Sequence, residues 1–139
     1  MWRTLAVGLV GLTGIAISAP GVKDAPKKDL PIVGEWLVLS IDGQKAIPTV
    51  CEFQTDGSLI ISTQFGTAES SFRWKYEVAE KYAPARVDMT AGDTLHEGIF
   101  KIEGERLTIC WREGRGKRPK EFGEKGATLE VFERVKRKD

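Results

Sequence analysis

The sequence predicts an all-β protein, an eight-stranded antiparallel up-and-down barrel that follows an N-terminal signal peptide. Three observations predict it. Apolar and polar residues alternate in short runs, which is typical of half-buried strands. Turns of hairpin length separate most of these runs. No stretch has a convincing helical periodicity. A β-sandwich built from the same strands is the alternative, because the number of strands alone does not distinguish the two folds.

The first 19 residues have the features of a secretory signal peptide. Arg3 precedes an uncharged run at residues 5–17, and small residues near its end have the spacing that a signal peptidase recognises. A membrane anchor is the alternative, but the run is short for a membrane span and contains three glycines. We therefore expect a secreted or periplasmic protein in which residues 20–31 form a flexible linker.

The rest of the chain, about 120 residues, is long enough for one domain with its own core. We place this domain at residues 32–135, followed by a basic tail at residues 136–139. Without Arg3 the chain has 20 basic and 20 acidic residues, so its formal charge is zero. A neutral, exported chain has no field that attracts nucleic acid, and we expect a monomer that does not bind it.

Eight segments have the composition of strands. They are residues 34–41, 49–54, 58–64, 70–78, 85–90, 98–103, 106–111 and 128–134. The first is apolar on both faces, so we expect it to be covered on both sides. An Asp-Gly pair at residues 56–57 predicts the turn between the second and third strands. The fourth has the cleanest alternation, with aromatic residues on one face and charged residues on the other.

The sixth and seventh segments form the clearest hairpin, with a turn at residues 104–105. The register that follows pairs Glu103 with Arg106, Ile102 with Leu107, Phe100 with Ile109 and Gly98 with Trp111. Opposite charges then face each other, and so do apolar side chains. The alternative register places Lys101 against Arg106, and we reject it because like charges would be paired.

Aromatic side chains dominate the faces that we expect to point inward. They are Trp36, Phe53, Phe72, Trp74, Tyr76, Phe100 and Trp111. One interpretation is a solid core that these rings fill. The other is a pocket for a small apolar ligand, since an eight-stranded barrel is wide enough for one. The candidate ligand-binding residues are then Trp36, Trp74, Tyr76, Phe100 and Trp111.

The longest predicted connection, residues 112–126, is strongly basic at its start. Its cations are Arg112, Arg115, Lys117, Arg118 and Lys120. They predict either an anion-binding rim, which would meet an acidic polysaccharide or an envelope protein, or a solvated loop whose charges aid solubility.

Catalysis and metal binding have little support. The single histidine, His96, lies near Asp88, Asp93 and Glu97, and we interpret this segment as a solvated loop rather than a cation site. No nucleophile motif accompanies the histidine, so we expect neither an enzyme nor a cofactor.

Cys51 and Cys110 could form a disulfide in an exported protein. The alternative is two small buried side chains. The hairpin register places Cys110 on the face opposite Phe100, whereas Cys51 alternates with Phe53 and points inward. Cysteines on opposite faces of a sheet cannot be joined.

Two resemblances follow from particular residues. Gly34-x-Trp36 on the first strand and Arg134 on the last resemble the lipocalin signature, in which a tryptophan closes one end of the barrel and a basic side chain packs across its ring. Almost the whole mature chain resembles a lipocalin-like domain of unknown function that is expanded in planctomycete bacteria. The residues that carry this resemblance are Gly34-Glu35-Trp36, Val87-Asp88, Gly98-Ile99-Phe100, Glu103-Gly104-Glu105, Leu107-Thr108-Ile109-Cys110, Arg118-Pro119, Phe122 and Leu129-x-Val131-Phe132-Glu133-Arg134. It implies an exported lipocalin-like barrel and no particular activity.

Overall fold

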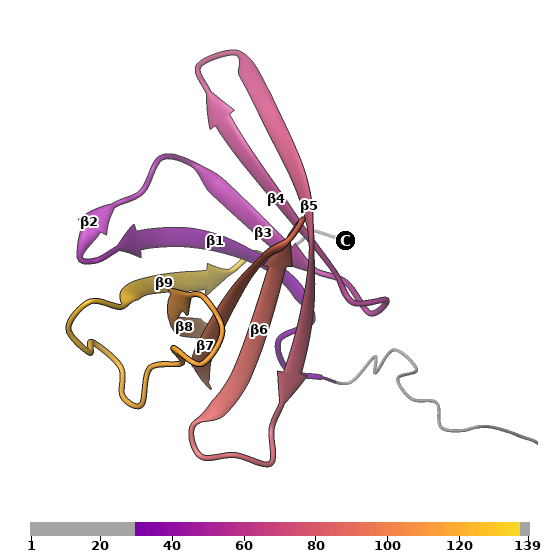
Figure 1. Ribbon diagram of the computed structural model, residues 1–139. Helices are drawn as coiled ribbons and strands as arrows, with labels where there is room; N and C mark the ends of the chain where they lie inside the picture. The colour runs from indigo at the N-terminus through magenta and orange to yellow at the C-terminus, as the bar shows by residue number, and fades with distance from the viewer. Residues whose placement is uncertain (1–29, 137–139) are drawn as a thin grey trace, which may run out of the picture.

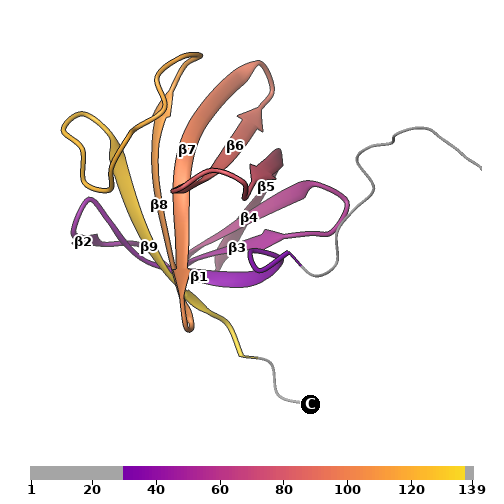
Figure 2. The same ribbon diagram turned by 90° about the horizontal axis from the view of Figure 1, so that it is seen from below.

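In the computed structural model, which describes residues 30–136, each long strand pairs antiparallel with the next one in the sequence. The strands are β1 (Gly34–Ile41), β2 (Gln44–Lys45), β3 (Thr49–Phe53), β4 (Ser58–Phe65), β5 (Ala68–Ala79), β6 (Ala85–Ala91), β7 (Thr94–Glu103), β8 (Arg106–Glu113) and β9 (Thr128–Arg134). β9 also pairs with β1, which closes the sheet into a barrel (Figures 1 and 2). The barrel is therefore confirmed and the sandwich is wrong. The predicted signal peptide lies outside the described residues.

All eight predicted strands are present, several with ends shifted by one or two residues, and there are two larger differences. β2, which the sequence analysis missed, has two residues and pairs with the end of β1, so the wall of the barrel has eight strands. β7 begins at Thr94, four residues earlier than predicted, because residues 92–93 form a tight turn after β6. The interpretation of the segment around His96 as a solvated loop is wrong, since His96 lies on β7 and is only 6% exposed.

The hairpin of β7 and β8 has the predicted register. Glu103 pairs with Arg106, Phe100 with Ile109 and Gly98 with Trp111. Gly98 is required here, because a Cβ atom at this position would lie 2.9 Å from the main-chain oxygen of Cys110 and 3.1 Å from the Cβ of Trp111. The close approach of the two strands therefore depends on the missing side chain.

One end of the barrel, called the closed end below, is covered by Trp36 and the residues around it. Trp36 is fully buried, and its indole nitrogen donates a hydrogen bond to the main-chain oxygen of Ile32 at 2.9 Å. The guanidinium of Arg134 lies 4.1 Å from the ring centre, which confirms the predicted contact between the first and last strands. Arg134 also donates to the main-chain oxygens of Pro31 and Val33.

The opposite end, called the open end below, is splayed. β5 pairs with β6 only from Lys75 onward, and β1 pairs with β3 only as far as Leu37. Past these points the β4–β5 hairpin projects from the barrel (Figure 1). Phe72 lies on this projection and is 57% exposed, so its predicted place in the interior is wrong. The predicted alternation of β5 is correct, but the strand extends beyond the end of the neighbouring strand β6.

The connection between β8 and β9, residues 114–127, is called the covering loop below because it lies across the outer face of β6, β7 and β8. Arg118 joins it to these strands through an ion pair with Asp88 at 2.8 Å and a hydrogen bond to the main-chain oxygen of Gly98. Pro119, within the loop, is fully buried. The loop also covers Cys110, which is therefore on the outside of the sheet while Cys51 is inside. Both thiols are free.

Within residues 30–136, no helix is long and apolar enough to cross a membrane.

Candidate ligand-binding site

The structure divides the five predicted ligand-binding residues between two places. Trp36, Tyr76 and Phe100 belong to the packed core, where each is at most 6% exposed. The Tyr76 hydroxyl donates to the main-chain oxygen of Gln54 at 2.6 Å, so its polar group is already satisfied. Trp74 and Trp111 are half-buried and lie toward the open end. The five residues therefore do not share one pocket, and only the last two are accessible to a ligand.

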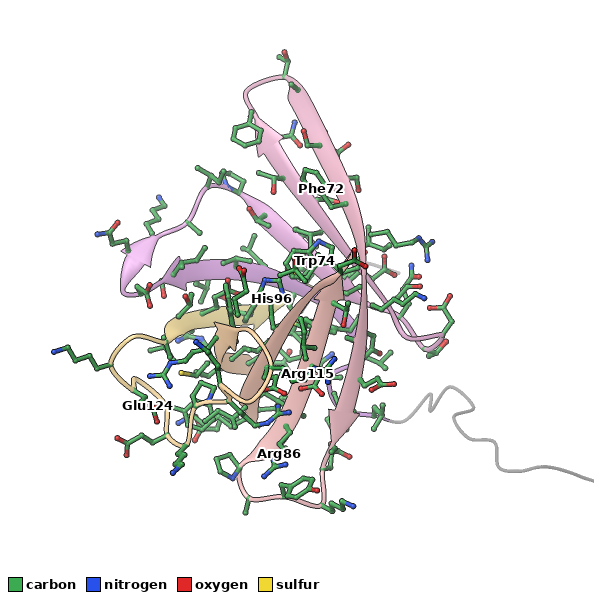
Figure 3. The ribbon with its side chains drawn as sticks, viewed as in Figure 1. Phe72, Trp74, Arg86, His96, Arg115 and Glu124 are labelled. Carbon is green, nitrogen blue, oxygen red and sulfur yellow. The ribbon has the colours of Figure 1, made fainter. Side chains whose placement is uncertain are left out.

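His96 connects these two tryptophans, although sequence reasoning did not place it in the site. Its ring stacks on Trp74 with centres 4.9 Å apart and planes 12° apart (Figure 3). Its edge meets Trp111, also at 4.9 Å, with the planes 86° apart. Three aromatic rings from β5, β7 and β8 thus form one cluster. The signal that could have revealed it is the Gly92-Asp93 turn, which extends the alternation of β7 back to Thr94.

Polar contacts fix the His96 ring. Its Nδ1 lies 3.3 Å from the main-chain oxygen of Met89, within hydrogen-bonding distance. Its Nε2 lies 4.0 Å from the carboxylate of Glu113, which is itself largely exposed. The imidazole is therefore held between a main-chain acceptor on one side and a carboxylate at the barrel rim on the other.

A second carboxylate, Glu130 on β9, lies beside the cluster. The pKa of Glu130 is raised above its usual value, chiefly by burial and also by the negative charge of Asp42, while a hydrogen bond from the Trp111 side chain acts in the opposite direction. The pKa of the Cys51 thiol, inside the barrel, is raised to about 12. Burial is the main cause, and the negative charge of Glu130 is a second, smaller one. The open end therefore combines aromatic rings with negative charge.

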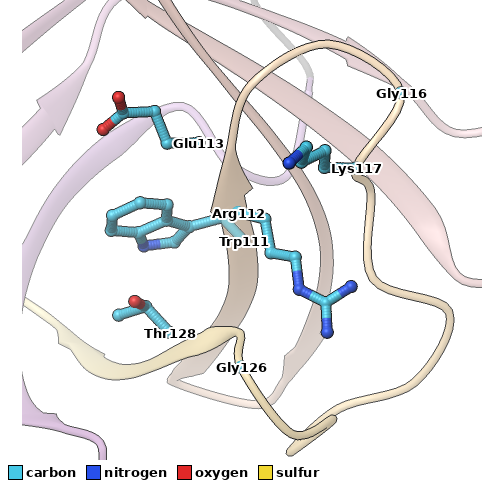
Figure 4. A pocket seen from close by; sticks show the side chains of 7 residues that line it. All are labelled: Trp111, Arg112, Glu113, Gly116, Lys117, Gly126 and Thr128. Atoms are coloured by element: carbon cyan, nitrogen blue, oxygen red, sulfur yellow. The ribbon is translucent and has the colours of Figure 1, made fainter.

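An open pocket of about 600 Å³ lies next to this cluster (Figure 4). It is lined by Trp111, Arg112, Glu113, Gly116, Lys117, Gly126 and Thr128. Residues of β8 and β9 form one wall and the covering loop forms the other. Trp111 belongs both to the pocket lining and to the aromatic cluster, so a molecule in the pocket would contact the cluster through this ring.

The five basic side chains between residues 112 and 120 are not gathered at one rim: Arg112 is near the end of β8, and the other four are spread over the covering loop. Arg112 pairs with Glu124 at 2.7 Å and donates to the main-chain oxygen of Lys125. Arg118 is occupied by Asp88 and lies 3.7 Å from Glu97. Three exposed cations, Arg115, Lys117 and Lys120, complete the set. Of these, Lys117 lines the pocket described above.

A smaller groove of about 390 Å³ lies on the outer face of β1, β3, β4 and β5. Its floor includes the apolar side chains of Leu37, Val50 and Ile60, and acidic residues such as Glu52 border it. The groove is separated from the aromatic cluster by the sheet itself, because Trp36 and Cys51 point to the opposite face.

Neither a family model nor a curated protein matches this chain. Among residues 30–136, no group of three His, Cys, Asp or Glu side chains is arranged to hold a metal ion.

Replacing Glu130 by Gln is expected to raise the melting temperature at pH 7 by a few degrees. The raised pKa means that the folded state resists ionising this group, so stability falls as the pH rises from about 4.5 through the pKa of the folded protein. The neutral amide avoids this cost. The difference between the two proteins should shrink toward pH 4, where the carboxyl is protonated in both states.

Thermal denaturation followed by circular dichroism at pH 4 and pH 7 measures this difference. Glu133→Gln is the matched control, because Glu133 lies on the same strand with an exposed side chain. A melting temperature of Glu130→Gln at or below that of the wild type at pH 7 would contradict the assignment.

Proposed function

We propose that this protein is an exported, lipocalin-like binding protein that holds a small, largely apolar ligand at the open end of its barrel. The observation that supports this function best is the cluster of Trp74, His96 and Trp111 beside the 600 Å³ pocket. Half-buried aromatic rings next to a concave surface with a few polar groups are typical of small-molecule sites. The role is one of binding rather than catalysis.

The filled core supports a ligand position at the open end of the barrel rather than inside it. Trp36, Phe53, Tyr76, Phe100 and Phe132 belong to one continuous cluster of buried side chains. A ligand reaching Trp36 would have to displace these rings, at a cost of several kcal/mol. At the open end, by contrast, Trp74 and Trp111 are already partly exposed, and β1 and β5 have separated from their neighbours.

The lipocalin-like assignment is supported by the closed end. A cation held over an indole where the first and last strands meet is the feature on which the resemblance rests, and Arg134 over Trp36 has this geometry. Export rests on the N-terminal sequence pattern alone.

The test is a fluorescence titration with N-phenyl-1-naphthylamine, a neutral probe that becomes bright in apolar surroundings. We expect saturable binding by the wild-type protein. Trp111→Ala should weaken it about tenfold, since loss of one large aromatic contact is worth about 1.4 kcal/mol or more. Leu37→Ser is the matched control, because Leu37 lines the groove on the outer face.

Binding that is lost in Leu37→Ser and retained in Trp111→Ala would move the site to the outer groove. A linear, unsaturable signal from the wild type would overturn the proposed function.

The second candidate is an interaction module with a solid core that contacts an envelope protein or an acidic polysaccharide through the basic loop. The exposed side chains of Arg115, Lys117 and Lys120 favour it. The wild-type protein should be retained on a heparin column at 0.15 M salt, and the variant with all three residues changed to Gln should not. If the wild type and the variant elute at the same salt concentration, this second function is excluded.

A further inference from the structure

Apart from His96, the ionisable side chains that the strand pairing turns inward at the open end are carboxylates. Cross-strand partners share a face of the sheet, so the pairing of His96 with Glu113 and of Ile109 with Glu130 places both carboxylates on the inward side. No Lys or Arg occupies an inward-facing strand position at this end in the part of the chain that the structure describes. The positive inward-facing side chain, Arg134, is at the closed end.

The two carboxylates lie beside the aromatic cluster. Glu130 is on the inward face of β9, diagonal to Trp111 on β8, and Glu113 lies 4.0 Å from the His96 ring. Indole faces are electron-rich and attract cations, most strongly where water is partly excluded. Phe72, exposed on the same face of β5 as Trp74, adds a further ring (Figure 3). Rings and carboxylates therefore converge on one place.

The cations of the pocket lie on the covering-loop side. Arg112 is neutralised by Glu124, and Lys117 projects from the loop opposite Trp111 (Figure 4). The wall that faces the aromatic cluster carries Glu113 and Thr128 instead. Charge is thus segregated across the pocket, and the apolar wall is the negative one.

We propose that the ligand at the open end carries a positive charge, as an amine or a quaternary ammonium group, which lies against Trp74 and Trp111 and is neutralised by Glu113 and Glu130. The apolar part of the ligand extends along the exposed face of Phe72. This inference rests on the proposed function and names the class of ligand for the same site.

Three probes with the same tail and different head groups test it: octyltrimethylammonium, octanoate and 1-octanol. Each competes with N-phenyl-1-naphthylamine for the wild-type protein at pH 7.5 and low salt. We expect octyltrimethylammonium to displace the naphthylamine at a concentration about tenfold lower than octanol does, and octanoate to be the weakest.

Carboxylate variants identify the source of this preference. In the double variant Glu113→Gln and Glu130→Gln, the ratio of the octanol to the octyltrimethylammonium displacement concentration, both measured on the same protein, should fall severalfold. Glu133→Gln, on the outward face of β9, is the control and should keep the full advantage.

The outcomes separate the two proposals. If octanol and octanoate compete as well as the cation, or if the double variant keeps the full preference, the charge assignment is overturned and the binding function stands. If the naphthylamine itself does not bind, both proposals fail.

Discussion

Replacing Trp36 by Ala is expected to lower the free energy of unfolding by about 4 kcal/mol, the usual cost of deleting a large aromatic side chain from a core. Trp36 is fully buried and contacts both the segment before β1 and the end of β9. Its loss removes the hydrogen bond to Ile32 and leaves the Arg134 guanidinium without the ring that it covers. Urea denaturation followed by circular dichroism measures the change.

Trp36→Phe is the control. It also allows the loss of stability to be measured if the alanine variant does not fold. It keeps most of the ring but cannot donate to Ile32, so we expect a smaller loss of about 1–2 kcal/mol. Because Trp36 is at the closed end, the phenylalanine variant should bind N-phenyl-1-naphthylamine as the wild type does. A Trp36→Ala protein with wild-type stability would contradict the role of Trp36 in closing the barrel.

Replacing Arg118 by Met is expected to cost about 2–3 kcal/mol, between the values for exposed and fully buried ion pairs. The side chain of Arg118 is 19% exposed and holds the covering loop to β6 and β7. Methionine keeps the length of the side chain but leaves Asp88 without its cation, and it leaves Glu97 with only the hydrogen bond from the main-chain N–H of Lys117. Arg115→Met, at an exposed position of the same loop, should change stability by less than about 0.5 kcal/mol.

Thiol labelling reports on the same loop more directly. Cys110 is fully buried under it, and its Sγ lies 3.7 Å from the main-chain oxygen of Glu121. Arg118→Met should therefore speed the reaction of Cys110 with an aromatic disulfide reagent at least tenfold, measured in a Cys51→Ala background. Equal labelling rates in Arg118→Met and Arg115→Met would show that Arg118 does not anchor the loop.

Local patterns were sufficient to predict the strands and their order. Period-two alternation reports which face of a strand is buried, and the charge pairing of Glu103 with Arg106 selected the correct hairpin register. The contact between Trp36 and Arg134 was predicted from the resemblance, and the structure confirms it. β2 escaped prediction because two residues carry no pattern.

The site was less predictable, because alternation gives the face of a side chain and not its depth along the barrel axis. Trp36 and Trp111 have the same inward direction, but one closes the barrel while the other lines an open pocket. Phe72 became exposed because β6 ends before it, which depends on a neighbouring strand. His96 and Glu130 join the cluster through pairings that only the folded sheet creates.

The most direct test of a ligand at the open end is native mass spectrometry of the protein purified from the organism that makes it. Wild-type protein and Trp111→Ala are compared, and denaturing extraction then identifies whatever co-purifies. We predict one small molecule bound in stoichiometric amount to the wild type and absent from Trp111→Ala, which remains folded. A wild-type protein with the mass of the chain alone, or an adduct equally abundant in Trp111→Ala, would contradict the account.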